Sequence, residues 1–159
     1  MDRGKSMRIR TASIYWIPNY GYIIFGMSKT TVGADVASDP FFNVPEIESD
    51  ADKIADIIKA SLCNDDSKRV PHPVDWKEFD KIFLKKTGVK SMRDFNKPTT
   101  KLVTVTSKED KILFSPMRPE KKPDKGFIPL IENEDVEVSD SASNKDIVDA
   151  FKFALEKCL

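Results

Sequence analysis

Hydrophobic and polar side chains alternate in two pairs of short segments, and each pair predicts a β-hairpin. Residues 11–17 and 22–25 are rich in β-branched and aromatic residues, and residues 18–21 between them (Pro-Asn-Tyr-Gly) are typical of a turn. Residues 101–106 alternate in the same way and are followed by the apolar segment 112–114. Because the two strands of each pair are close in sequence, antiparallel pairing is favoured.

Two proline-containing regions are expected to be loops, and a third region should add two strands. Residues 26–48 lack a sustained period and contain Asp-Pro and Val-Pro breaks, so we expect a loop there. Residues 115–126 combine three prolines with many charges and should form an exposed loop. Further strands are expected at 127–131 and 136–138, and Pro129 should restrict the first of them to a sheet edge or a bulge.

Apolar residues recur at helical spacing in three segments, and each segment has capping residues. Ser49, Asp75 and Ser143 are suitable N-caps, because each is followed three residues later by an acidic residue. Gly88 stands where a left-handed C-cap would end the second helix, and Ser91 suggests one further helical turn. The apolar stripes comprise Ile54, Ile57, Ile58 and Leu62 in the first segment, Trp76, Phe79, Ile82 and Phe83 in the second, and Ile147, Val148, Phe151, Ala154, Leu155 and Cys158 in the third.

These elements predict an α+β domain in which a mostly antiparallel β-sheet packs with about three α-helices. The chain has 159 residues, of which 40% are hydrophobic and ten are Phe, and this suits one domain with a substantial core. Residues 1–10 are expected to form a flexible N-terminal arm, and residues 11–159 a single domain.

The cysteines and the apolar runs bear on the compartment. Cys63 and Cys158 both fall on the apolar side of a helical pattern, so we expect two core thiols, although a disulfide between them would also be compatible with the sequence. No apolar run approaches the ~20 residues that cross a bilayer, and the polar N-terminal segment lacks the features of a secretory signal. We therefore expect a cytoplasmic protein without a membrane partner.

Side chains that carry catalysis or bind metals are sparse. His72 is the one histidine, which excludes a histidine-based triad and a multi-histidine metal site, and its position between two prolines predicts an exposed loop. The glycines in 4–6 and 26–33 do not match a phosphate-binding loop, and the paired carboxylates are typical of a solvated surface. We expect no enzyme activity, cofactor, metal or small-molecule substrate; a hydrolase that uses carboxylates and His72 is the enzymatic alternative.

The formal net charge is zero, with 26 basic and 26 acidic residues, but the charges are segregated along the chain. Residues 35–66 hold nine acids and two lysines (−7), residues 81–125 hold 13 bases and five acids (+8), and residues 132–149 hold seven acids and one lysine (−6). A zero sum argues against a bulk polyanion binder, whereas opposed patches suit docking to a charged macromolecule. The alternative is an ordinary solvated surface in which the charges intermix after folding.

Four aromatic residues around the first hairpin leave a second function open. Tyr15, Trp16, Tyr20 and Tyr22 could form a stacking platform for bases, and the basic region 81–125 could bind the phosphates, as in a nucleic-acid-binding module. Packing in the core and across the strands is the competing explanation for the same residues.

The segment 76–95 (WKEFDKIFLKKTGVKSMRDF), the strands at 101–106 and 112–115 and the capped terminal helix resemble the immunity proteins (CdiI type) of bacterial contact-dependent growth inhibition systems. The similarity extends from residue 11 to residue 158 and rests on a Trp-led helix, a Thr-Gly-Val-Lys-Ser joint and a hairpin. It implies a small cytosolic protein without catalytic activity. Such proteins bind and neutralise the C-terminal toxin domain of a large exoprotein, and this toxin is often a nuclease.

A basic nuclease cleft would be complemented by an acidic patch, so the partner-binding surface is expected in an acidic segment. The segment 132–140 is the first choice, since it is dense in acids and lies beside expected edge strands, and 46–52 is the second. Under this hypothesis the partner is the toxin domain itself, and direct nucleic-acid binding is not expected. The predicted partner-binding residues are Glu132, Glu134, Asp135, Glu137 and Asp140.

Overall fold

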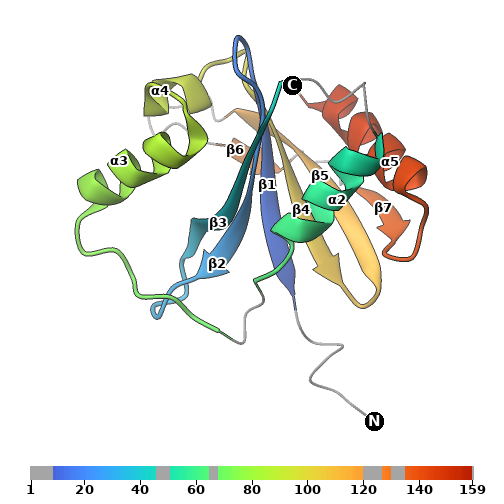
Figure 1. Ribbon diagram of the computed structural model, residues 1–159, viewed down its shortest axis with the longest axis horizontal. Coiled ribbons are helices and arrows are strands. Elements are labelled where there is room, and N and C mark those ends of the chain that lie inside the picture. The colour runs from blue at the N-terminus through green and yellow to red at the C-terminus, as the bar shows by residue number, and fades with distance from the viewer. Residues whose placement is uncertain (1–8, 46–50, 65–67, 120–126, 130–134, 159) are drawn as a thin grey trace.

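The computed structural model describes residues 9–45, 51–64, 68–119, 127–129 and 135–158. Within these residues one β-sheet lies between two layers of helices (Figure 1). The strands are β1 (Arg10–Ile17), β2 (Gly21–Lys29), β3 (Asp35–Val44), β4 (Lys101–Lys108), β5 (Lys111–Pro119), β6 (Phe127–Pro129) and β7 (Val136–Ser139). The helices are α2 (Ala51–Ser61), α3 (Trp76–Thr87), α4 (Met92–Phe95) and α5 (Asn144–Lys157).

The sheet is antiparallel at every pair of these strands. The strand order is β3-β2-β1-β4-β5-β6, and β7 also pairs with β5. The first half of β5 pairs with β7, and its second half pairs with β6, so β3 forms one edge of the sheet while β6 and β7 form the other. This architecture confirms the expected α+β class, both expected hairpins and the three long helices.

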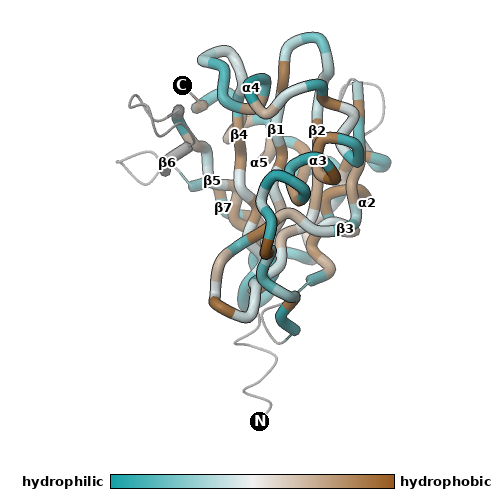
Figure 2. Tube along the Cα trace, turned by 90° about the vertical axis from the view of Figure 1, so that its left-hand side faces the viewer, coloured by the Kyte–Doolittle hydropathy of each residue, from teal (hydrophilic) through white to brown (hydrophobic). Residues whose placement is uncertain are grey.

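Alternation along the strands creates a core on each face of the sheet, because successive side chains point to opposite sides. Ile14 and Ile24 pack with α2 and α5 in the larger core, which also contains Phe151. Ile17 and Phe25 pack with α3 and α4 in the smaller core. Figure 2, which looks onto the α3 side, shows hydrophobic colour on the central strands and alternating colours along α3.

The expected helix caps are present wherever the residues are described. Asp75 accepts hydrogen bonds from two N–H groups of the first turn of α3, at 3.0 and 3.3 Å, and Gly88 ends this helix with φ of 76°. Ser91 caps α4 and Ser143 caps α5 in the same way as Asp75. Ser49, the expected cap of α2, lies outside the described residues.

The loop expected at 26–48 is wrong, because β2 continues to Lys29 and β3 pairs with it. Two features conceal these strands in the sequence. A register shift between Phe25 and Gly26 interrupts the alternation, and Pro40 lies within β3 at this irregularity. An edge strand tolerates a proline at a bulge, because no ladder hydrogen bond is required there.

Two expectations about burial are also wrong. The apolar stripe of α3 is divided, since Phe83 is 8% exposed whereas Trp76 is 46% and Ile82 is 49% exposed. Both cysteines are free thiols, and Cys158 is buried while Cys63 is exposed. Helix α3 therefore keeps large apolar side chains on its outer surface.

The remaining boundaries follow the expectations closely. The strands expected at 127–131 and 136–138 are β6 and β7, and β5 extends into the first part of the loop expected at 115–126. Strand β1 begins at Arg10, and residues 1–8 of the expected arm lie outside the described residues. Among the described helices, none is long and apolar enough to cross a membrane.

Candidate partner-binding surface

Three of the five predicted partner-binding residues lie at β7. Glu132 and Glu134 lie outside the described residues. Asp135 precedes β7, Glu137 lies within it and Asp140 follows it. All three side chains are exposed, so each is accessible to a partner.

Glu137 and helix α5 lie on opposite faces of the sheet. Val136 and Val138 pack against the larger core, and the alternation of the strand turns Glu137 to the other face. Its Oε2 atom lies 3.6 Å from Lys111 Nζ, and both side chains are more than half exposed. An exposed ion pair of this kind contributes less than about 1 kcal/mol to stability, so a partner could readily replace it.

The β4–β5 turn brings two further carboxylates to this end of the sheet. Glu109 and Asp110 form the two-residue connection of the hairpin, and both are exposed. The N–H of Asp140 donates a hydrogen bond to the carbonyl oxygen of Asp110 at 3.0 Å, which joins the two turns. We call Glu109, Asp110, Glu137 and Asp140 the acidic corner. The sequence analysis missed the first two because they belong to the segment whose charges sum to +8.

This turn has an unusual composition for its backbone. Glu109 has φ of 52° and Asp110 has φ of 66°, and positive φ at both central positions is the pattern of a type I′ turn, which prefers Asn-Gly. The left-handed region costs a non-glycine residue about 1 kcal/mol or more. The chain therefore places two carboxylates at the hairpin tip at the expense of stability.

The helices of the α2–α5 layer carry no excess of acid. Helix α2 has two acids and two lysines, and α5 has three acids and three lysines. Asn144 links the two helices, because it donates a hydrogen bond to Asp52 at 3.1 Å and accepts one from Lys59 at 3.3 Å. The acidic segments of the sequence therefore do not make this helical layer acidic.

His72 is not the exposed loop residue that its sequence context predicts. It is half-buried, its Nδ1 atom lies 3.0 Å from Thr30 Oγ1, and its ring meets that of Trp76 edge-on with centroids 5.4 Å apart. Thr30 is fully buried, so this contact anchors the connector before α3 to the end of β2. In the part of the chain that the structure describes, no three His, Cys, Asp or Glu side chains are grouped as a metal ion would require.

Three of the four aromatic residues of the first hairpin, Tyr15, Tyr20 and Tyr22, pack against the two cores. Tyr15 stacks with Phe25 and meets Phe95 edge-on, with centroids 6.0 and 4.9 Å apart, and burial raises the pKa of Tyr15 to about 12. Tyr22 packs against Phe151 in the other core. Because Tyr15 and Tyr22 lie on opposite faces of the sheet, they do not form one open platform for stacked bases, and the nucleic-acid alternative loses this support.

Comparisons with known proteins concern the fold. No family model matches the chain, and no curated protein matches it. A protein of unknown function from Neisseria meningitidis has a similar structure, with a TM-score of 0.70, 16% identity and full coverage of both chains. A chain of the CdiA-CT/CdiI toxin and immunity complex from Yersinia pseudotuberculosis is also similar, with a TM-score of 0.61, 18% identity and coverage of 95% of this chain and 98% of that one. At these identities, the chain shares a fold with a component of a toxin and immunity complex.

Proposed function

We propose that this chain is an immunity protein that binds and neutralises the C-terminal toxin domain of a contact-dependent growth inhibition exoprotein. The observation that carries the proposal is the fold shared with a chain of the Yersinia pseudotuberculosis toxin and immunity complex, over 95% of the present chain. The succession of Trp-led helix, joint and hairpin in the sequence supports the same family. On this proposal the protein is not an enzyme and acts by covering a surface that the toxin needs.

The acidic corner is the surface that we expect to meet the toxin. Its four carboxylates are exposed, and the neighbouring lysines of the turn, Lys108 and Lys111, offset only part of their charge. A toxin that cleaves RNA or DNA needs a basic cleft to attract phosphates, and the same cleft would attract an acidic surface. Complementary charge of this kind mainly raises the association rate and disfavours partners of like charge.

The binding test uses the full chain and the toxin domain encoded beside its gene. We expect the two purified proteins to form a stable complex, and we expect coexpression of this chain to protect cells from that toxin domain. The toxin domain of an unrelated system is the control. If the neighbouring toxin domain neither bound the chain nor was neutralised by it, the proposed function would be wrong.

The double substitution Glu109→Asn/Asp110→Gly separates binding from folding. It removes two charges from the acidic corner and supplies the residues that a type I′ turn prefers, so we expect a gain in stability of about 1 kcal/mol. At low salt we expect association with the toxin domain to become about three- to tenfold slower. The control Asp146→Asn/Glu156→Gln removes the same charge from α5 and should leave this rate within about twofold. Equal rates for the two variants would exclude the acidic corner and leave the immunity function itself untouched.

A further inference from the structure

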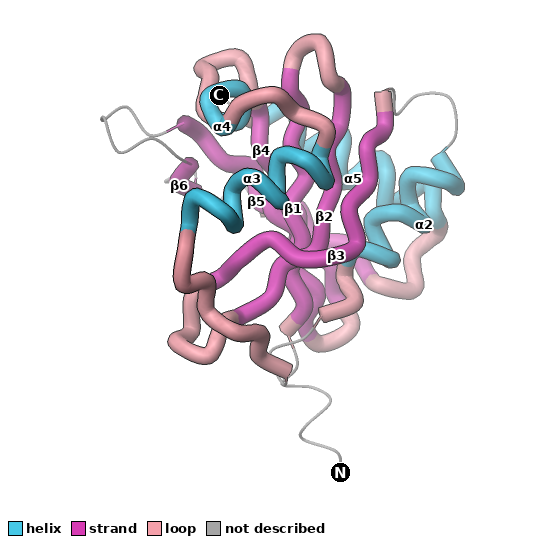
Figure 3. The backbone as a smooth tube through the Cα atoms, turned by 60° about the vertical axis from the view of Figure 1, so that its left-hand side comes forward, coloured by secondary structure: helices cyan, strands magenta, loops and turns pink. Residues whose placement is uncertain are grey.

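Helix α3 and the edge strand β3 enclose a groove at the opposite edge of the sheet from the acidic corner. Figure 3 shows α3 lying across the strands beside β3. The groove has a volume of about 370 Å³. Its lining is mainly apolar and includes Phe41 of β3, Phe79, Ile82 and Phe83 of α3, and His72 of the connector. A groove of this size and character suits an apolar side chain of a partner.

Two large apolar side chains of α3 are exposed here: Ile82 lines the groove, and Trp76 packs beside it against two lining residues. Trp76 is 46% exposed and Ile82 is 49% exposed. The ring of Trp76 meets His72 and Phe79 edge-on, with centroids 5.4 Å apart in both pairs, and His72 is itself fixed to the buried Thr30. An ordered, exposed aromatic side chain loses little entropy on binding, which is typical of interface hot spots.

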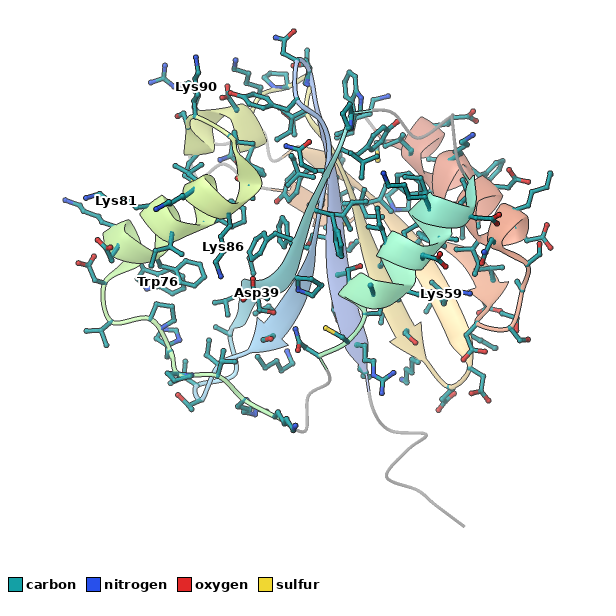
Figure 4. All side chains as sticks on the ribbon, in the orientation of Figure 1. Asp39, Lys59, Trp76, Lys81, Lys86 and Lys90 are labelled. Carbon is teal, nitrogen blue, oxygen red and sulfur yellow. The ribbon has the colours of Figure 1, made fainter. Side chains whose placement is uncertain are left out.

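The outer face of α3, which adjoins the groove at the exposed Ile82, is basic. Lys77, Lys81 and Lys85 follow one another at intervals of four residues on α3, and all three are exposed. They form one column, and within the described residues none of the three has a carboxylate within ion-pair distance. Lys86 instead points toward β3, where its Nζ atom lies 3.1 Å from Asp39 (Figure 4). A column of like charges at this spacing is unfavourable until carboxylates approach it.

We propose that the groove between α3 and β3 is a docking site for an acidic protein segment, which inserts an apolar side chain between Phe41, Phe79 and Ile82, continues over Ile82 and places its carboxylates on the lysine column of the outer face of α3. The lining favours a protein over a nucleic acid, because nine of its thirteen residues are apolar and bases would need more donors and acceptors than its four polar side chains, those of Ser38, Asp39, His72 and Lys86, offer. The inference is independent of the proposed function, since this partner has the opposite charge to the one expected at the acidic corner.

The test begins with the chemistry of the segment that binds. The full chain is immobilised and screened against random peptides of about twelve residues displayed on phage. We expect the enriched peptides to combine several Asp or Glu residues with one or two Leu, Phe or Trp residues. The leading peptide is then synthesised and titrated into the isotope-labelled chain, where we expect chemical-shift changes at α3 and β3 and not at α5.

Variants of exposed residues provide the second measurement. Ile82→Ser alters the groove and Lys81→Glu/Lys85→Glu reverses the column, and each should weaken the peptide at least about tenfold. The matched control Lys145→Glu/Lys152→Glu on α5 should change affinity by less than about twofold. Because Ile82 and the lysines are exposed, these variants should fold. The chemical-shift changes are measured on the unaltered chain, so that result does not depend on the folding of any variant.

Several results would overturn the proposal. These are the recovery of basic or uncharged peptides, the absence of enrichment, shift changes confined to other elements, and equal binding by the Ile82→Ser variant. Tighter binding of a single-stranded oligonucleotide at α3 than of any peptide would also overturn it, in favour of a nucleic acid. Dimer formation through α3 that excludes the peptide would overturn it in favour of a second copy of this chain.

Discussion

Truncation of Phe83 to alanine should destabilise the protein by about 3 kcal/mol. The side chain is 8% exposed, and its ring centroid lies 5.0 Å from that of Phe95, 5.3 Å from that of Phe25 and 6.0 Å from that of Phe41. Loss of a buried phenylalanine costs about 3–5 kcal/mol. We expect the lower end of this range, because Phe83 lines the groove and the vacated space would open to solvent instead of remaining a closed cavity.

Truncation of the neighbouring Ile82 should cost about 0.5 kcal/mol. This side chain is 49% exposed, so about half of the ~2 kcal/mol that full burial of an isoleucine provides is available to be lost. The higher helix propensity of alanine returns about 0.4 kcal/mol of that loss. The loss of stability should therefore be about six times larger for Phe83→Ala than for Ile82→Ala, although the two residues are adjacent in one helix.

Urea unfolding followed by circular dichroism measures both effects. The m-values should stay unchanged, so that only the midpoints shift. For a chain of 159 residues, Phe83→Ala should lower Tm by about 6–12 °C and Ile82→Ala by about 1–2 °C. Phe83→Leu keeps most of the volume and, as a control, should cost less than about 1.5 kcal/mol. Similar losses for Ile82→Ala and Phe83→Ala would mean that the outer side of α3 is packed, and would refute the reasoning about the groove.

Three further predictions concern the C-cap of α3, the buried Tyr15 and the two cysteines. Gly88→Ala should lower the free energy of unfolding by about 1–2 kcal/mol in thermal unfolding, because Gly88 has φ of 76° at the end of α3. Gly88→Asn should lower it less, since asparagine tolerates this conformation better than alanine. Equal losses of stability for the two variants would contradict the assignment of Gly88 as the C-cap. Tyr15 should ionise near pH 12 in the folded protein, so its contribution to the free energy of unfolding should be constant below pH 10 and fall between pH 10 and 12. Tyr15→Phe should remove this contribution, so urea unfolding across that range should show a smaller fall for the variant than for the unaltered chain. Thiol reagents should label the exposed Cys63 rapidly and Cys158 only when the protein unfolds. Burial shields the Cys158 thiol and raises its pKa, so little of the reactive thiolate forms. Rapid labelling of both cysteines would show that the C-terminal end of α5 is open to solvent.

Elements with local signals could be predicted from the sequence. Ser143 directly precedes α5 as its N-cap, and five of the six residues in the apolar stripe of this helix and its C-cap are buried. In the first hairpin, Asn19 and Gly21 have φ of 75° and 87°, as turn residues that tolerate positive φ should. Each signal depends on neighbours a few residues away, so the rest of the fold hardly changes it.

Strand β3 could not be predicted, because its evidence is not local. The register shift after Phe25 destroys the alternation, Pro40 argues against a strand, and only pairing with β2 makes the segment extended. The same limit explains the error on α3. Trp76 and Ile82 fit the helical stripe as well as Phe83 does, and only the position of α3 over the sheet decides which side chains are covered.

The candidate site depended on tertiary structure even more than the fold did. Charge sums along the chain assigned Glu109 and Asp110 to a basic segment, yet the hydrogen bond between Asp140 and Asp110 places them beside β7. A charge sum over a segment of the sequence combines residues that lie on both faces of the folded sheet. They therefore predicted the existence of separated charges and not their locations.

The acidic corner and the groove lie at opposite edges of the sheet, and this separation makes the two proposals testable one at a time. From β3 to β7 the sheet crosses five inter-strand spacings of about 4.8 Å, or about 24 Å in all. That distance is about three Debye lengths at physiological ionic strength, so reversing charge at one surface hardly changes the potential at the other. If Lys81→Glu/Lys85→Glu slowed toxin association, the toxin would have to contact both edges of the sheet. A loss confined to Glu109→Asn/Asp110→Gly would instead leave the groove free for a second, acidic partner.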